Sequence, residues 1–448
     1  MNTFTLPYGE QCIPSEFSNP AGAVIYSDGK GGFTASISVP DWTGGATPNV
    51  RYINADTGND TSGDGLTAAT AWRSMSKAWA VASPADIIVM SDYVPRAYAG
   101  QTTGSAQAIP ARMRIRSGAP SGRSVIGAFD QGTAFTWSLH STGVYTTSAN
   151  VAASVFDRKY SDSKNVPAAL TVVSTLADCQ GLAGSVFFDY ANGTNIYVHL
   201  KDNRIPDAQV IVSRNVGCWS FSQSASGALR LEGLTTVFPY SGSDGLRLSS
   251  TSTPNTAVFS QKDCVHIGSY YNALAIVRTS LSISENCACA YSGRDGFNYT
   301  DGANPSPMVI YEIDCTGKFA GASDYIRGPV LTGSDNCSTC HSGMQIARIN
   351  CGYSDARGPV VADVNGAVSV NYGVSANRCA LTSGDSRANF YHNTELDSRG
   401  GSMALVGCVS DSSLGEYMIS TPDSTRPVSV SAWRGNPNGL IFPGSVTS

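Results

Sequence analysis

The sequence predicts an all-β fold built as a repeat solenoid, in which short strands stack coil upon coil. Strand-like segments separated by turn residues recur from residue 85 onward. Cysteines return at regular intervals, for example 23 residues from Cys264 to Cys287 and 28 from Cys287 to Cys315. Repeats of this length are typical of one solenoid coil. Charged residues are only 14% of the chain and glycines number 46, which suits many strands joined by polar turns.

Composition also excludes several classes of protein. The net charge is −5, and no run of Lys or Arg exceeds two residues, so we expect no nucleic-acid partner. No apolar run approaches the roughly 18 residues of a membrane span, so we expect no membrane insertion. The first residues, MNTFTLPYGEQC, lack a basic start and an apolar core. We therefore expect no secretory signal and synthesis in the cytoplasm.

Residues 1–50 form a region of their own, rich in Gly, Pro, Ser and Asn. One alternating run, Phe33 to Val39, is a candidate strand. We interpret the region as an attachment segment; the alternative is an edge strand of the main fold.

The next region combines a strand, acidic glycine turns and a helix. Residues 51–56 read as a strand, and Met75, Ala78, Trp79 and Ala82 follow the i, i+3, i+4, i+7 spacing of one apolar helix face. Ser74 is placed to cap this helix, and Pro84 lies just past its end. Residues 85–90, ADIIVM, then read as a fully buried strand. We expect no second helix beyond them.

The rest of the chain reads as strands and turns. The strand-like segments are MRIR, SVIGAF, NIYVHL, AQVIVS, GALRLEGL, DGLRLSS, SLSISEN, MVIYEID and AVSVNYG. The cysteines form two series, Cys264, Cys287, Cys315 and Cys340, then Cys351, Cys379 and Cys408, and several follow Asn, Asp or Arg. We interpret them as a buried, reduced ladder up the interior, with strands about 4.8 Å apart. Disulfides are the alternative.

The stretch YINADTGNDTSGDGLTAATAWRSMSKAWAVASPADIIVM resembles the entry of right-handed parallel β-helix proteins, the pectate-lyase-like solenoids of polysaccharide-active enzymes and phage tailspikes. A second region, from DGFNYT through VIYEIDC and NCSTCHSG to GPVVADVNG, is similar to the body of such phage tail proteins. The resemblance implies a right-handed parallel β-helix over residues 51–420, with a short N-terminal capping α-helix at about 57–84. Residues 421–448 would form a C-terminal strand and tail. The body of the family carries an acid after the histidine, whereas this chain has Ser342 after His341.

Glu312 and Asp314 are the leading candidates for catalysis. If Ile313 and Cys315 point into the core, the two acids point outward on one strand face. Residues two apart on a strand lie about 6.5–7 Å apart, and carboxyl separations of about 5–9.5 Å serve glycoside hydrolysis. The alternative is an exposed acidic strand face.

Further candidates lie in the same third of the chain. Asp295 stands on a turn beside Phe297 and Tyr299, where an acid and an aromatic ring suit a sugar; an ordinary Asp-Gly turn is the alternative. Arg348 alternates with inward Ile349 and is a candidate for a two-pronged contact with an acidic sugar. His341 and Asp363 complete the proposed substrate-binding set.

Metal and cofactor motifs are incomplete. Asp56, Asp60 and Asp64 do not have the 1, 3, 5 ligand spacing of an EF-hand, and no Lys follows the glycines as in a phosphate loop. CSTCH (Cys337 to His341) matches a haem attachment motif, and Cys337, Cys340, His341 and Cys351 are a partial zinc set without a second CxxC. We expect no metal and no cofactor.

Three functions follow from these expectations. The first is a homotrimeric phage tailspike that binds and depolymerises a bacterial surface polysaccharide, capsule or lipopolysaccharide, with residues 1–50 attached to tail or baseplate proteins of the virion. Its chemistry would be glycosidase-like, with lysis as the variant. The second is a receptor-binding or structural tail protein without catalysis. The third is a free polysaccharide lyase, which predicts an export signal and a calcium cluster.

Overall fold

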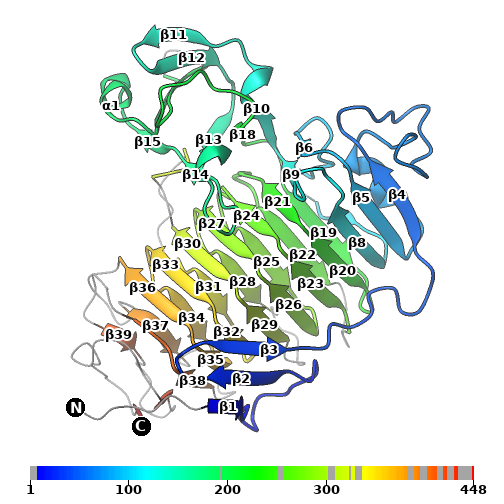
Figure 1. Cartoon of the computed structure of the whole chain (residues 1–448), viewed down its shortest axis with the longest axis vertical. Helices are drawn as coiled ribbons and strands as arrows, with labels where there is room; N and C mark the ends of the chain where they lie inside the picture. Colours follow the sequence, from blue (N-terminus) through cyan, green and yellow to red (C-terminus); the bar gives the residue numbers. More distant parts are fainter. Residues whose placement is uncertain are drawn as a thin grey trace.

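Three long parallel sheets dominate the computed structural model (Figure 1). The described residues are 8–103, 105–191, 193–250, 256–300, 308–321, 324–327, 335–380, 388–393, 401–410, 417–420, 428–431 and 446–447.

Each coil between β19 and β36 contributes one strand to each sheet. The 12-stranded sheet contains β4 (Asn49–Ile53), β5 (Ala85–Val89), β8 (Arg112–Ser117), β20 (Ala228–Glu232), β23 (Val258–Lys262), β26 (Leu281–Glu285), β29 (Val309–Ile313), β32 (Gln345–Ile349), β35 (Val368–Tyr372), β38 (Ser402–Val406), β40 (Val428–Ser431) and β41 (Val446–Thr447). The eight-stranded sheet contains β6 (Tyr93–Val94), β9 (Ser124–Gly127), β21 (Leu234–Val237), β24 (Val265–Ile267), β27 (Ala288–Ser292), β30 (Thr316–Ala320), β33 (Gly352–Ala356) and β36 (Ser375–Cys379). The nine-stranded sheet contains β7 (Gln107–Ala108), β19 (Trp219–Gln223), β22 (Leu246–Ser250), β25 (Leu274–Val277), β28 (Phe297–Thr300), β31 (Ser338–Cys340), β34 (Val361–Val364), β37 (Ala388–Asn393) and β39 (Tyr417–Ser420).

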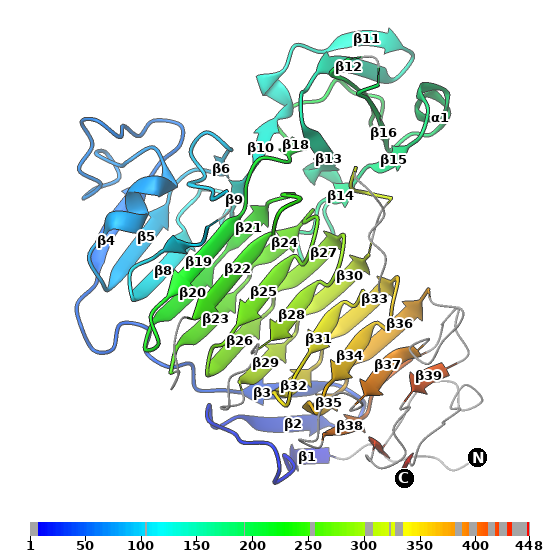
Figure 2. The ribbon, with the colours of Figure 1, turned by 180° about the vertical axis from the view of Figure 1, so that it is seen from behind.

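The strand pairing confirms the predicted fold class, a parallel β-helix. From β19 the chain visits the nine-, 12- and eight-stranded sheets in turn and then begins the next coil in register, as β19 with β22 and β20 with β23 illustrate. Figure 2 shows the same stack from behind. Because every coil stacks on the one before it, apolar side chains form a column along the interior.

One corner of each coil explains the Asx-Cys motif. Asp263, Asn286, Asp314 and Asn350 have φ between 51° and 54°, the left-handed conformation that Asn and Asp tolerate best. Each ends a strand of the 12-stranded sheet and turns the chain, so that the following cysteine points into the core. Such stacked corners also bond to one another, since the Asn350 amide donates to Asp314 at 2.5 Å.

The cysteine ladder is confirmed for five cysteines, and two expected members, Cys340 and Cys379, lie elsewhere. Cys264, Cys287, Cys315, Cys351 and Cys408 occupy equivalent, buried corner positions. Val374, which follows Gly373 at the same corner, takes the place expected for Cys379. Cys379 instead ends β36, and Cys340 lies in β31. All twelve cysteines are free in the structure. The spacing misassigned two members because coils differ in length.

The expected α-helix after the acidic turns is a 3₁₀-helix, η1 (Met75–Ala80). Met75 and Ala78 are fully buried, as three-residue spacing requires of one 3₁₀ face. Trp79 contacts the core, with its ring centroid 5.1 Å from that of Phe221. Ala82 is exposed and the Ser74 side chain makes no capping hydrogen bond, so those two expectations are wrong. A role for η1 in covering the end of the stack stays a prediction.

A mainly antiparallel subdomain is inserted between β9 and β19, and the sequence did not indicate it. Its two sheets contain β10 (Phe129–Gln131), β13 (Ala152–Asp157), β14 (Ala168–Ala169) and β18 (Val210–Arg214), and β11 (Ser138–Ser141), β12 (Val144–Ser148), β15 (Thr171–Val173), β16 (Ser185–Asp189) and β17 (Asn195–His199). It also contains η2 (Gly132–Ala134), η3 (Arg158–Tyr160) and the short helix α1 (Leu176–Gly181). The expectation of no helix beyond residue 85 is therefore wrong.

The insertion has its own core and also packs on the eight-stranded sheet. Phe129, Phe156 and Ile211 form one apolar cluster with Val265 and Tyr291 of the β-helix. In Figure 1 it stands above β21, β24 and β27.

Residues of the N-terminal region cover the 12-stranded sheet. A three-stranded antiparallel sheet, β1 (Tyr8–Gln11), β2 (Val24–Asp28) and β3 (Phe33–Ser36), crosses the outside of the stack (Figure 1). Phe17, Ile25 and Phe33 are buried there against Tyr311 and Tyr372. The outer face of these coils is therefore apolar because it has an intramolecular cover.

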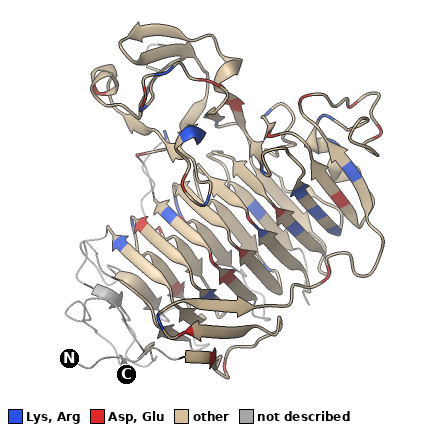
Figure 3. Ribbon diagram, in the orientation of Figure 1, with Lys and Arg blue, Asp and Glu red and all other residues tan. Residues whose placement is uncertain are grey.

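Charges of both signs are interspersed along the ribbon (Figure 3). The described part of the chain contains no helix long and apolar enough to cross a membrane.

Candidate functional site

Glu312 points into the β-helix, which contradicts the expected outward face. Its side chain is fully buried, whereas its neighbours Tyr311 and Ile313 pack outward beneath the N-terminal sheet. The expected parity assumed an unbroken strand from Glu312 to Cys315. The left-handed corner at Asp314 interrupts the alternation, so Glu312 and Cys315 are both internal and only Asp314 is exposed. The two acids therefore do not form an outward pair.

Three of the predicted site residues meet in a buried polar network. Arg348 forms a two-pronged ion pair with Asp363, with N–O distances of 2.8 and 3.0 Å, and both side chains are fully buried. Ser338 accepts a hydrogen bond from Arg348 at 2.9 Å and donates one to Glu312 at 3.1 Å. Arg348 was expected to point outward; it points inward in β32, level with Glu312 in β29. Because these side chains are fully buried, a polysaccharide cannot contact them.

Burial governs protonation in this network. It raises the pKa of Glu312, while the positive charge of Arg348 and the hydroxyls of Tyr353 and Ser338 act in the opposite direction. Tyr299 is also fully buried, in the apolar column, so its expected exposed ring is not available for stacking on a sugar. Each charged side chain of this network has a hydrogen-bond or ion-pair partner, as is typical of a structural interior.

Asp314 lies at the corner where the inserted subdomain meets the β-helix. Lys164 of the insertion donates to the Asp314 carbonyl oxygen at 2.9 Å and bonds the Asn286 side chain. Lys318 forms a second link, 2.6 Å from Asp162. Asp314 thus helps to anchor the insertion.

Asp295 lies in the turn that leads into β28 and belongs to a ladder of Asx residues. Its Oδ1 accepts the backbone N–H of Asn336 at 2.8 Å, and its own N–H donates to Asn272 at 3.1 Å. The Asn298 amide donates to its Oδ2 at 2.6 Å. Burial, the largest cause, raises the pKa of Asp295 to about 7, and the charge of Asp335 adds to the effect.

His341 is brought close to Asp295 through Asn298, whose amide nitrogen lies 3.4 Å from the His341 Nε2. Burial lowers the pKa of His341, so the ring is neutral at pH 7. Asp335, which sequence reasoning missed, is 3% exposed and ion-paired with Arg357. The arrangement holds a carboxyl that titrates near neutrality, with a second carboxylate nearby, which is what acid–base chemistry requires. We name Asp295, Asn298, Asp335 and His341 the Asp295 cluster.

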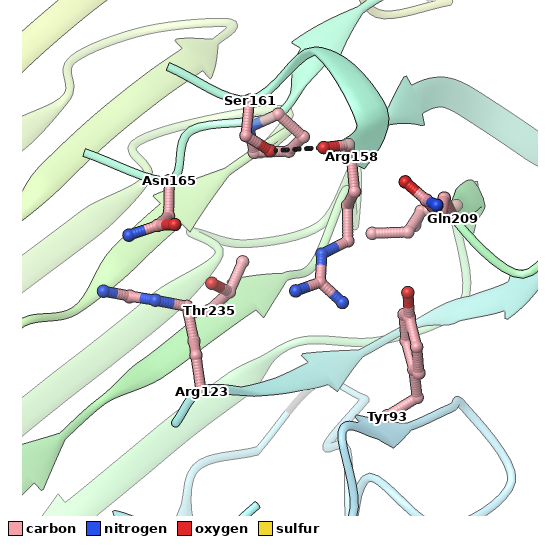
Figure 4. Close-up of a pocket in the computed structure, with 9 residues that line it drawn as sticks. Tyr93, Arg123, Arg158, Ser161, Asn165, Gln209 and Thr235 are labelled. Atoms are coloured by element: carbon pink, nitrogen blue, oxygen red, sulfur yellow. Dashed lines mark hydrogen bonds between the residues drawn. The ribbon is translucent and has the colours of Figure 1, made fainter. Parts of the chain in front are cut away.

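A separate pocket lies between the insertion and the eight-stranded sheet (Figure 4). Its volume is about 260 Å³. The residues lining it are Tyr93, Arg123, Arg158, Ser161, Asn165, Pro167, Gln209, Ile211 and Thr235. No local sequence signal joins Arg123 to Arg158, because only the fold of the insertion brings them to one space.

The described residues contain no group of three or more His, Cys, Asp or Glu side chains placed to hold a metal ion. The acids of the early glycine turns serve the backbone instead: Asp60 accepts from the N–H groups of Arg73 and Ser74, and Asp64 from that of Leu66.

The fold and these sites define a parallel β-helix protein with an inserted, mainly antiparallel subdomain. No family model and no curated protein matches the sequence. Solved structures with a similar fold include pectate lyase Pel9A, at 11% identity over 90% of this chain and 78% of that one, with a TM-score of 0.44. A protein described as a glycoside hydrolase matches at 10% identity over 88% and 96%, with a TM-score of 0.42. The tailspike gp49 of Acinetobacter baumannii bacteriophage Fri1, a capsular polysaccharide depolymerase, matches at 8% identity over 99% and 69%, with a TM-score of 0.33.

Proposed function

We propose that this protein is a phage tailspike that binds a bacterial surface polysaccharide and cleaves its glycosidic bonds at the Asp295 cluster. The observation that carries the proposal is that Asp295, Asp335 and His341 lie together in one cluster, where burial raises the pKa of the Asp295 carboxyl to about 7. A carboxylic acid that keeps its proton near neutrality can donate it to a leaving glycosidic oxygen.

The residues of the Asp295 cluster take different proposed roles because their surroundings differ. Asp295 acts as the general acid, and Asn298 orients it through the 2.6 Å hydrogen bond. Asp335 acts as the second carboxylate: burial raises its pKa, and the ion pair with Arg357 opposes that shift by favouring the charged form. Neutral His341 binds a sugar hydroxyl. The tailspike assignment further proposes a homotrimer that attaches to the phage tail through residues 1–50.

A non-catalytic receptor-binding protein is the second candidate, and one observation favours it. Asp295 is only 8% exposed and accepts two hydrogen bonds, as a ladder residue with a purely structural role would. Under this alternative the polysaccharide is bound and stays intact.

Incubation with a panel of bacterial surface polysaccharides separates these functions, when polymer mass and ultraviolet absorbance are followed together. Loss of mass without new absorbance, abolished in Asp295→Asn and Asp335→Asn but kept in Asp56→Asn, supports the proposal; Asp56 is an exposed acid of the early turns. Loss of mass with new absorbance indicates a lyase. Binding without loss of mass indicates the receptor-binding protein.

A further inference from the structure

The pocket beneath the insertion contains two arginines that the proposed cleavage does not use. Arg123 precedes β9 of the eight-stranded sheet, and Arg158 begins η3 of the insertion. Their side chains enter the same space from opposite walls (Figure 4). The guanidinium carbon of Arg158 lies 5.0 Å from the ring centroid of Tyr93. That contact fixes the direction of one cation.

Neither arginine forms an ion pair with a described residue. Within the described residues, no carboxylate lies within ion-pair distance of Arg123 or Arg158, and the side chain of Arg123 donates to the Leu234 carbonyl oxygen at 3.4 Å. Two acids of the insertion near the pocket are already neutralised: Asp157 pairs with Arg204 at 2.7 Å, and Asp162 with Lys318 at 2.6 Å. The pocket therefore carries an excess of positive charge.

Two like charges held together in a half-buried space are unfavourable unless an anion joins them. Burial is the largest cause that lowers the pKa of Arg123; the charge of Asp263 acts in the opposite direction, and that of Arg158 adds to the lowering. The rest of the lining supplies polar groups that suit hydroxyls: Thr235 from the sheet, and Ser161, Asn165 and Gln209 from the insertion. Tyr93 adds a flat apolar face.

The pocket wall is rigidly attached to the β-helix. Lys164, next to the pocket residue Asn165, bonds the Asp314 carbonyl oxygen, and Asp162 bonds Lys318. Phe156 of the insertion packs on Tyr291, with ring centroids 5.9 Å apart. Such anchoring fixes the insertion, which carries Arg158, against the sheet whose strand β9 is preceded by Arg123.

We propose that this pocket binds a carboxylate-bearing sugar residue, with Arg123 and Arg158 on the carboxylate and the polar lining on the ring hydroxyls. Its volume of about 260 Å³ lies below the roughly 300–1,000 Å³ of pockets for drug-sized ligands, so it suits one sugar unit and not a long segment of chain. The inference rests on the proposed function only for the origin of that sugar in a surface polysaccharide.

Isothermal titration of the full-length protein tests the proposal. The probes are glucuronate, galacturonate and N-acetylneuraminate, each beside its uncharged methyl ester, together with inorganic phosphate. We expect at least one acid to bind at millimolar concentration or better, and its ester to bind at least tenfold more weakly, since each charge-assisted hydrogen bond is strong. Arg123→Gln and Arg158→Gln should each weaken binding about tenfold or more, and Arg158→Lys by less.

Arg96→Gln is the matched control, because Arg96 is exposed, lies outside the pocket and pairs with Asp130. It removes the same charge and should leave binding unchanged. Circular dichroism of each variant shows that a loss of binding does not come from unfolding. The proposal is overturned if no sugar acid binds, if phosphate binds as tightly as the sugar acids, or if Arg96→Gln reduces binding as much as the pocket variants do. Binding of a sugar acid without any polysaccharide cleavage refutes the proposed cleavage and leaves this pocket assignment standing.

Discussion

Arg348 and Asp363 form an ion pair inside the β-helix, with two N–O contacts of 2.8 and 3.0 Å and no exposed surface on either side chain. Arg348 comes from the 12-stranded sheet and Asp363 from the nine-stranded sheet, so the pair ties two walls of the stack together. Its second neighbour is Glu312, whose negative charge stabilises the guanidinium. The interior of these coils is therefore organised by polar contacts as well as by the cysteine ladder.

Removing one partner of this pair should destabilise the protein strongly. We expect Asp363→Ala to lower the free energy of unfolding by about 3–5 kcal/mol, because it leaves a buried guanidinium with one carboxylate fewer. Denaturant unfolding measures the change. Arg378→Gln, at the surface pair with Asp355, is the control and should cost under about 1 kcal/mol. Equal effects would show that burial of the first pair has no energetic importance.

Asp295 should give the protein a pH-dependent stability. Its pKa is about 7 in the folded chain, against 3.8 for an unperturbed aspartate, so the folded state keeps a proton that the unfolded state has lost. The contribution of Asp295 to stability is then greatest below about pH 4 and falls by a few kcal/mol as pH rises to about 7. Asp295→Asn should remove that part of the decline in urea unfolding curves, whereas Asp56→Asn should not. An unchanged pH profile in Asp295→Asn would contradict the raised pKa.

His266 predicts the opposite dependence at acid pH. The ring is fully buried and bonds Gln261 and Thr236 at 2.7 Å each, and burial lowers its pKa to about 3. Between about pH 6.5 and pH 3 the ring is protonated in the unfolded state and neutral in the folded state. The free energy of unfolding therefore falls as pH drops through this range. His266→Gln should reduce this loss, and exposed His140→Gln should leave it unchanged. If NMR shows that the His266 ring takes up its proton near pH 6 in the folded protein, the prediction is wrong.

The thiols should differ sharply in reactivity. Cys12 is exposed and the other eleven cysteines are buried. Burial raises the pKa of Cys315 and Cys351 well above its usual range, which suppresses the reactive thiolate. We expect one thiol to react with a disulfide reagent in the native protein, none in Cys12→Ser, and all twelve in the unfolded wild-type chain. Rapid reaction of several native thiols would argue against a closed ladder.

The N-terminal sheet should contribute directly to stability. Phe33 is 2% exposed, and its ring lies 5.8 Å from that of Tyr372 on the 12-stranded sheet. We expect Phe33→Ala to lower the free energy of unfolding by about 3–5 kcal/mol and to raise binding of a hydrophobic dye. Tyr26→Ala, at an exposed position of the neighbouring strand, is the control. If Phe33→Ala is as mild as Tyr26→Ala, the sheet is only loosely attached.

Local patterns were enough to identify strands and corners. The segments ADIIVM and MVIYEID became β5 and β29, because apolar runs between turn residues have few alternatives to a buried strand. Asx followed by Cys marked the corner, since Asn and Asp accept a left-handed backbone and cysteine fills a small internal space. The two-residue alternation of a strand predicted an outward Glu312, but its side chain is internal. The prediction is wrong because one left-handed residue, Asp314, breaks the two-residue period.

What the sequence determined by itself was therefore the class of fold and the repeating corner, which depend on neighbours along the chain. Only the tertiary structure decided that Glu312, Arg348 and Asp363 are internal, that residues 8–36 cover a sheet, and that Arg123 and Arg158 share a pocket. Each of these depends on contacts between coils and insertions distant in the chain. Burial and charge pairing are properties of that three-dimensional arrangement, and no local pattern of residues specifies them.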